Sequence, residues 1–129
     1  MTISYWCIFI TLLFPWICTA LGKTLGGFKT HHNVDPRRFE ANLEGKAKNA
    51  IYAQQNSFEI FPAFAVSVLI AQQFSVMPQD IIDNLCIIFV VSRVSYLFAY
   101  LYNFSLLRST LWFIGVLIII TFFIYPYFY

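Results

Sequence analysis

Hydrophobic residues along this chain gather into four long stretches, separated by connections that carry most of the charge. The stretches cover roughly residues 2–22, 48–74, 81–104 and 110–129. Each has about the 20 residues that an α-helix needs to cross the hydrocarbon core of a bilayer. The pattern therefore predicts an all-α membrane protein, a bundle of four transmembrane helices that forms one domain over residues 1–129.

The connection between the first two stretches, residues 23–47, contains both loop and helix signals. Gly26-Gly27 indicates a loop, after which Asp35-Pro36 pairs an N-cap with a proline at the first helical position. We expect a helix to begin there and to continue into the second stretch, with a weak point at Gly45.

Two points concern the first and last stretches: whether the first is a retained span, and where the helix of the last begins. Residues 2–22 resemble a secretory signal peptide in hydrophobicity but lack its basic start, so we expect a retained span in which Pro15 is tolerated as a bend. The fourth helix is expected to begin at Ser109 or Thr110, because either side chain can serve as an N-cap.

Charged residues are scarce and unevenly distributed. They make up 11% of the chain, against about 25% in soluble domains, which excludes a water-soluble domain. Six of the eight basic residues lie in the segment 23–48, and the connection that holds Arg108 falls on the same side of a four-span protein. By the positive-inside rule this face is cytoplasmic and both termini are non-cytoplasmic. The clustering indicates membrane orientation, with no nucleic acid as partner.

Two charged residues, Glu59 and Arg93, lie inside apolar stretches. A charge at bilayer depth costs about 2.5–3.5 kcal/mol even on lenient insertion scales, so each is expected to face protein. At about 1.5 Å per residue, each lies roughly 15 Å below the basic face. We therefore expect a Glu59–Arg93 ion pair. A purely structural pair, with Asn56 bonding between helices, accounts for the spacing as well as a functional site does.

Two polar stripes at helical spacing are expected to face each other in the cytoplasmic half of the bundle. Their residues are Tyr52, Asn56 and Glu59 on the second helix, Arg93, Tyr96 and Tyr100 on the third, and Arg108 with Ser109 just beyond it. Taken singly, the two tyrosines of the third helix are packing residues and Arg108 is an interfacial anchor. Together they predict a site open to cytoplasmic solutes and to the bilayer.

Metal chemistry finds little support in the sequence. Cys7, Cys18 and Cys86 lie apart in apolar stretches without chelating spacing, and are expected to be buried hydrophobic residues. His31-His32 has no third ligand nearby, which favours a solvated loop over a metal site. No nucleophile motif or phosphate-binding glycine loop occurs.

The string AQQNSFEIFPAF, from Ala53 to Phe64, resembles the signature of the MAPEG family, the membrane-associated proteins in eicosanoid and glutathione metabolism. The core of that signature is Asn-x-x-Glu with a nearby Pro-x-Phe. The run from Ser92 to Tyr100, followed by Leu107-Arg108-Ser109, is similar to the family's second conserved region. The resemblance extends over the whole chain in length and four-span order.

This resemblance implies a left-handed four-helix bundle that assembles as a homotrimer. Glutathione would bind between subunits near the cytoplasmic face, and a lipophilic substrate would arrive from the bilayer. Arg108 would be catalytic by stabilising the glutathione thiolate, and Arg93 would be a structural cation paired with Glu59. The residues that would bind glutathione are Asn56, Glu59, Tyr96, Tyr100, Ser109 and Tyr52.

The chain departs from the family at Tyr52, because glutathione-using members usually have an arginine four residues before the asparagine. This departure is similar to a less characterised bacterial branch, which implies a bacterial inner membrane. Two functions are open: a glutathione-dependent transferase or peroxidase acting on lipophilic electrophiles or hydroperoxides, or a non-catalytic member that binds a lipid or serves in an assembly. A transporter or channel is disfavoured because no inverted repeat is visible.

Overall fold

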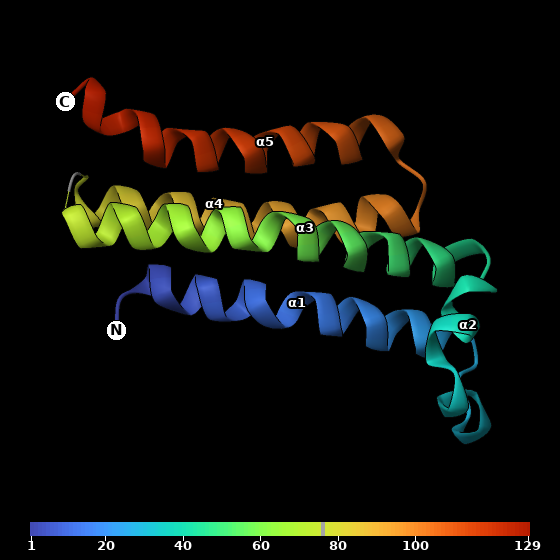
Figure 1. Ribbon diagram of the computed structural model, residues 1–129. Coiled ribbons are helices and arrows are strands. Elements are labelled where there is room, and N and C mark those ends of the chain that lie inside the picture. The colour runs from blue at the N-terminus through green and yellow to red at the C-terminus, as the bar shows by residue number, and fades with distance from the viewer. Residues whose placement is uncertain (76) are drawn as a thin grey trace.

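Four long helices make up most of the computed structural model, which describes residues 1–75 and 77–129 (Figure 1). They are α1 (Ile3–Leu25), α3 (Gly45–Phe74), α4 (Gln79–Leu101) and α5 (Ser105–Ile124). The short helices are η1 (Thr30–Val34), α2 (Pro36–Ala41) and η2 (Tyr125–Tyr127). Each of the four long segments is long and apolar enough to cross a membrane. The predicted four-helix membrane bundle is confirmed, and the protein is a multi-pass integral membrane protein.

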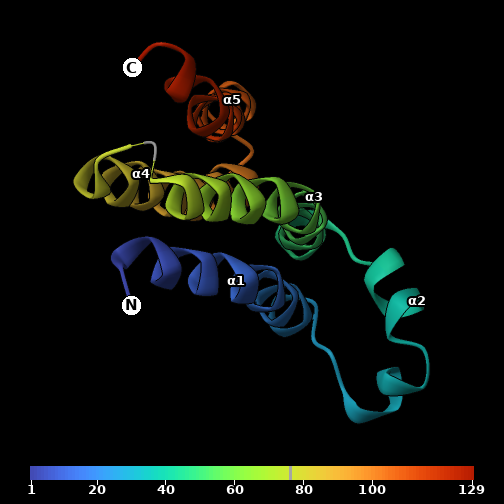
Figure 2. The same ribbon diagram turned by 60° about the vertical axis from the view of Figure 1, so that its left-hand side comes forward.

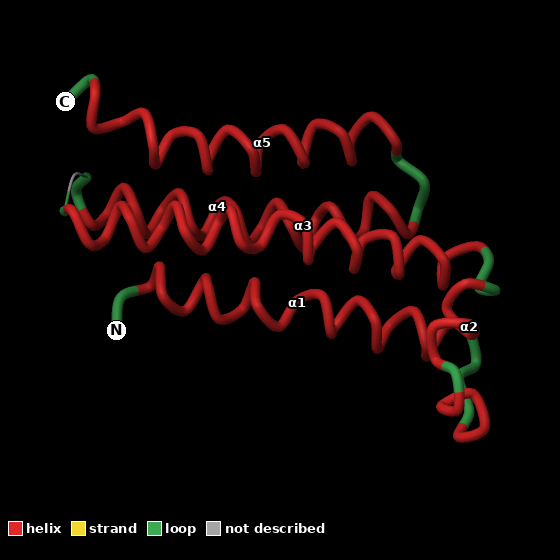
Figure 3. Tube along the Cα trace, in the orientation of Figure 1, coloured by secondary structure: helices red, strands yellow, loops and turns green. Residues whose placement is uncertain are grey.

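The central layer of the bundle is formed by α3 and α4. Helix α1 packs on one side of this pair and α5 on the other, as Figures 1 and 2 show. Both chain termini lie at one end, while η1, α2 and the α4–α5 connection lie at the opposite end (Figure 3). The basic connection and Arg108 therefore share one end of the bundle, as the sequence predicts.

Different side chains fill the helix contacts in the two halves of the bundle. In the half of the bundle near the termini, the rings of Phe64 on α3 and Phe89 on α4 stack at 3.8 Å between centroids. In the other half, α3 buries small side chains such as Ala50 and Ala53, which pack with Cys18 of α1. Stacked rings therefore fill the contact between α3 and α4 in one half, and small side chains line the contact between α1 and α3 in the other.

The expectation of one continuous helix from Asp35 into the second span is wrong. The Asp35 cap is confirmed, because its Oδ1 accepts a hydrogen bond from the Arg38 backbone N–H at 3.2 Å. Helix α2 nevertheless ends at Ala41, and α3 begins at Gly45, whose φ of +61° lies in the left-handed region. Because glycine adopts this conformation without steric cost, the weak point predicted at Gly45 is a complete break.

The fourth helix begins at Ser105, earlier than the expected start at Ser109 or Thr110. Helix α4 ends at Leu101. Asn103, two residues later, adopts the left-handed conformation, and the Phe104 N–H donates to the Ala99 carbonyl at 2.9 Å. This is the Schellman arrangement, which ends one helix within two residues and lets the next begin at once. The Thr110 hydroxyl donates to the Leu106 carbonyl at 2.9 Å, as a residue inside a helix does.

A close approach of α1 and α3 at Gly22 leads to a stability prediction. A Cβ atom placed on Gly22 would lie 2.8 Å from Ile51 Cδ1 and 3.2 Å from the Ala47 carbonyl oxygen. We expect Gly22→Val to lower the free energy of unfolding by about 1–3 kcal/mol, because the added atoms force the helices apart. Thermal unfolding in detergent measures the effect. Ala20→Val, at an exposed position of the same helix, is the matched control, and an equal loss in both variants would contradict the packing argument.

Candidate functional site

Arg93 is the most deeply buried charged residue of the described chain, with 2% of its surface exposed. It lies on α4 and faces α3, where its Nη2 donates to Asn56 Oδ1 at 2.8 Å and to Ser57 Oγ at 3.3 Å. An amide oxygen and a hydroxyl thus solvate one edge of the guanidinium inside an apolar bundle. These two hydrogen bonds hold α3 and α4 in one register.

The expected ion pair between Glu59 and Arg93 is not formed. Glu59 is exposed, and its Oε2 accepts only a long hydrogen bond, 3.5 Å, from Asn56 Nδ2. The helical period explains this, since Glu59 is two residues beyond buried Ser57 and therefore points about 200° away from it around the axis of α3. The carboxylate contacts Arg93 only indirectly, through the Asn56 amide.

The remaining edge of Arg93 is held by an aromatic ring. Within the described residues, its Nε and Nη1 are buried without a hydrogen-bond partner. Its Cζ lies 4.2 Å from the centre of the Tyr96 ring, one turn further along α4. Attraction between the cation and the electron-rich face of the ring offsets part of the missing hydrogen bonds.

A second cation, Arg108, lies at the other end of a row that runs from Arg93 through the rings of Tyr96 and Tyr100. Tyr96 and Tyr100 meet edge to face at 5.4 Å between centroids, and the Cζ of Arg108 lies 4.5 Å above the Tyr100 ring. Arg108 reaches this position from the first turn of α5, just after the short α4–α5 connection. The Asn49 side chain of α3 holds that connection, because its Nδ2 donates to the Tyr100 carbonyl at 2.9 Å and to Asn103 Oδ1 at 3.0 Å.

A cavity of about 370 Å³ lies beside this row, between α3, α4 and α5. It is lined by Asn56, Tyr96, Arg108, Ser109, Trp112 and Phe113. Of the residues predicted from the sequence, four therefore share one cavity, and Tyr100 lies against Arg108 at its edge. Glu59 and Tyr52 are exposed on α3 outside the lining.

The sequence interpretation missed the apolar wall of this cavity. Trp112 and Phe113 were not among the residues predicted for the site. Because α5 begins at Ser105, Trp112 lies one helical turn after Arg108 and on the same face. The i, i+4 spacing from Arg108 is the signal that identifies this wall.

The cavity combines a positive charge, polar groups and an apolar surface. Arg108 is half-buried and forms no salt bridge among the described residues, so its charge is available to a ligand. Asn56 and Ser109 provide polar contacts on one side, while the two aromatic rings from α5 provide an apolar surface. For metal binding, the described residues contain no group of three His, Cys, Asp or Glu side chains placed to hold an ion.

Comparison with known proteins gives one match. The sequence model that describes the MAPEG family matches residues 3–128, which is essentially the whole chain. No curated protein and no solved structure matches the chain.

The contact between Asn56 and Arg93 leads to a second stability prediction. Asn56→Leu removes the acceptor of a partly buried hydrogen bond from a charged donor, and we expect a loss of about 1.5–3 kcal/mol in the free energy of unfolding. Gln55→Leu makes the same chemical change at an exposed neighbouring position and should have little effect. Chemical unfolding in mild detergent compares the two. Equal stability of both variants would show that the hydrogen bond between Arg93 and Asn56 contributes nothing to the free energy of unfolding.

Proposed function

Because the chain belongs to the MAPEG family, we propose that it is a membrane-embedded glutathione-dependent transferase or peroxidase. Its substrates are lipophilic electrophiles or hydroperoxides that arrive from the bilayer. The observation that carries the proposal is Arg108, a cation without a carboxylate partner among the described residues, in the wall of a cavity that is also lined by aromatic rings.

Arg108 acts on the glutathione thiol. The thiolate is the nucleophilic form of a thiol, and a guanidinium nearby favours it by stabilising the negative charge. Tyr100 lies against the Arg108 guanidinium and limits its movement, which keeps the charge at the cavity. Arg108 therefore raises the fraction of bound glutathione that can react at neutral pH.

Two reactions are available to a thiolate held in this cavity. With an electrophile, the sulfur forms a carbon–sulfur bond and the leaving group departs with the electron pair of the broken bond. With a hydroperoxide, the sulfur attacks the outer oxygen, the O–O bond breaks, and the products are an alcohol and glutathione sulfenic acid. A second glutathione converts the sulfenic acid into a disulfide and water. Trp112 and Phe113 provide the apolar surface along which a lipophilic substrate lies.

We propose that the protein assembles as a homotrimer, and the exposed polar residues of α3 support contact between copies. Glu59 is exposed on a membrane-spanning helix of the single chain, and contact with lipid at that depth is costly. A neighbouring copy that covers this face removes the cost and adds its own residues to the site. In the assembly, Asn56 and Glu59 bind glutathione, with Tyr52, Tyr96, Tyr100 and Ser109 around it.

Lys48 compensates for the missing arginine at position 52. Its Nζ lies 5.6 Å from the centre of the Tyr52 ring and donates a hydrogen bond to the Ala41 carbonyl at 2.9 Å. A carboxylate of glutathione that reaches Tyr52 therefore also meets the positive charge of Lys48. Lys48 therefore supplies the positive charge that an arginine at position 52 provides in other family members.

A non-catalytic protein of the same family, which binds a lipid or serves in an assembly, is the second candidate. Tyr52 favours it, because a tyrosine attracts a glutathione carboxylate less strongly than an arginine does. In this case the polar contacts of Glu59, Asn56 and Arg93 have a structural role alone.

The membrane orientation is part of the proposal. The basic connection between α1 and α3 lies in the cytoplasm and both termini lie on the other side, by the positive-inside rule. Glutathione then reaches the site from the cytoplasm. We propose a bacterial inner membrane as the location, as the resemblance at Tyr52 implies.

Removal of the Arg108 charge tests the proposal directly. We expect reduced glutathione to bind the detergent-purified protein saturably, and Arg108→Ala to weaken binding about tenfold or more through loss of a charged contact. Isothermal titration measures the affinity, and ultraviolet absorbance measures the bound thiolate. Arg37→Ala removes an exposed arginine outside the cavity and should behave as the unmodified protein. Full glutathione-dependent turnover in Arg108→Ala would remove this residue from the mechanism.

Glu59→Gln distinguishes the two candidate functions. For a glutathione-dependent enzyme we expect weaker glutathione binding at nearly unchanged stability, since Glu59 makes only one long hydrogen bond within the chain. If Glu59 has only a structural role, Glu59→Gln lowers the stability of the assembly and leaves the ligand affinity unchanged. Titration calorimetry and thermal unfolding of the same preparation give both values.

A further inference from the structure

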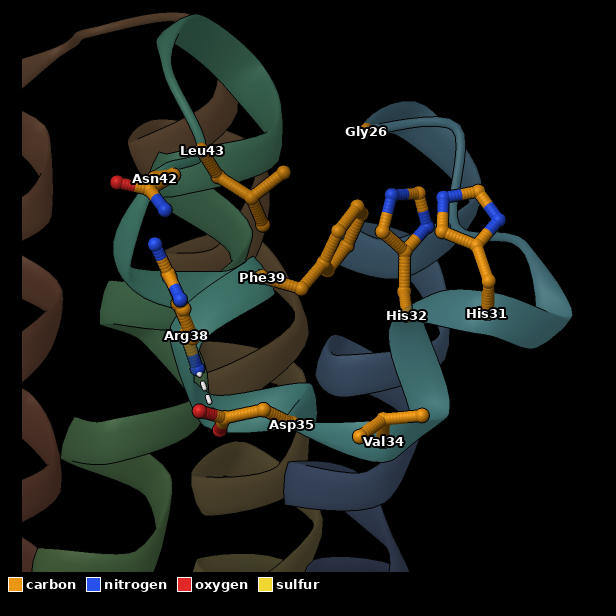
Figure 4. Close-up of a pocket in the computed structure, with 9 residues that line it drawn as sticks. All are labelled: Gly26, His31, His32, Val34, Asp35, Arg38, Phe39, Asn42 and Leu43. Carbon is orange, nitrogen blue, oxygen red and sulfur yellow. Dashed lines mark hydrogen bonds between the residues drawn. The ribbon is translucent and has the colours of Figure 1, made fainter.

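A second polar cavity lies at the basic end of the bundle, away from the one beside Arg108. It has a volume of about 460 Å³ and lies between the end of α1, η1 and α2. Figure 4 shows His31 and His32 side by side along one wall, Arg38 and Asn42 on the opposite side, and Phe39 between them. No residue of this cavity belongs to the proposed glutathione site.

Packing fixes the orientation of the His32 ring. The ring lies 4.5 Å from Phe39 and 4.0 Å from His31 between centroids. Its Nδ1 accepts a hydrogen bond from the Lys29 backbone N–H at 2.8 Å, which leaves the proton of the neutral ring on Nε2. Partial burial lowers the pKa of His32, and the charges of His31 and Lys29 act in the same direction. At neutral pH, His32 is therefore a fixed N–H donor.

Arg38 provides the charge of this cavity. Its neighbour Arg37 pairs with Glu40 at 3.4 Å, whereas Arg38 forms no salt bridge among the described residues. Asp35 also lines the cavity, and one of its oxygens accepts the Arg38 backbone N–H. The cavity thus offers a free guanidinium, an imidazole N–H and the Asn42 amide, with one carboxylate at its edge. This set suits an anion that carries a hydroxyl group of its own.

The level of the cavity in the membrane indicates where such an anion comes from. Helix α1 has 23 residues, which at about 1.5 Å per residue span roughly the thickness of the hydrocarbon core. Gly26, the residue directly after α1, lines the cavity. The cavity therefore lies at the depth of the lipid headgroups, where phosphate groups are abundant and basic protein pockets attract them.

We infer that the cavity formed by His31, His32, Arg38 and Asn42 binds a phosphate group, carried by an anionic phospholipid headgroup such as phosphatidylglycerol or by free phosphate. The guanidinium and the His32 Nε2 proton bind the phosphate oxygens, and a headgroup hydroxyl donates to Asp35. A bound headgroup fixes η1 and α2, the most weakly packed helices of the basic end, against the membrane surface. This inference does not depend on glutathione binding.

Native mass spectrometry of the full chain in a phosphate-free detergent tests this inference. The probes are dioctanoyl phosphatidylglycerol, dioctanoylglycerol as a lipid with the same tails but no phosphate, and inorganic phosphate. We expect phosphatidylglycerol to bind and dioctanoylglycerol not to bind at this site. Arg38→Gln should lower phosphatidylglycerol binding about tenfold or more, because a charged contact is lost.

Arg37→Gln is the matched control, since it removes the same charge one residue away and outside the cavity. Its lipid binding should equal that of the unmodified chain, and thermal unfolding of both variants confirms that they fold. Competition by inorganic phosphate would identify the free ion as a ligand, whereas phosphatidylglycerol binding without competition would identify the headgroup. Equal losses in Arg37→Gln and Arg38→Gln, or no binding of either phosphate probe, would overturn the inference.

Discussion

The hydrogen bond from buried Arg93 to Asn56 determines much of the remaining structure. A guanidinium in an apolar bundle must find acceptors within the protein, because lipid offers none. The Asn56 amide and the Ser57 hydroxyl supply them from α3, and the Tyr96 ring covers part of what remains. Any sliding or rotation of α3 against α4 would break these contacts. The polar face of the central helix pair is therefore held in one arrangement, and the cavity beside it has a defined shape.

The position of Arg108 depends on a different constraint, the abrupt end of α4. Asn103 in the left-handed conformation turns the chain within a few residues, and Asn49 of α3 bonds to this connection. Helix α5 then starts early enough to place the Arg108 guanidinium over Tyr100. The two cations thus end up on the same row of aromatic rings, although fifteen positions separate them in the sequence.

Much of this fold could be predicted from hydrophobic stretches and charge distribution, because span length and composition alone distinguish a membrane helix. Family motifs indicated Asn56, Tyr96, Arg108 and Ser109 as well. The details that were missed depend on local geometry. Glu59 has the right depth to pair with Arg93, but depth does not give the direction of a side chain around the helix. The start of α5 was placed too late because Ser109 and Thr110 suit a cap, whereas the left-handed turn at Asn103 lets the helix begin at Ser105.

Helix α5 is attached to the bundle unevenly. Its buried residues, Gly115, Ile118 and Phe122, all lie in the half nearer the C-terminus, whereas the half with Arg108, Trp112 and Phe113 has none. Substitutions on the wall of the cavity therefore disturb little of the packing that keeps the helix in place. Such a division lets mutation alter which apolar molecules fit the cavity while the protein still folds, so ligand preference in proteins of this architecture can diverge faster than the scaffold itself.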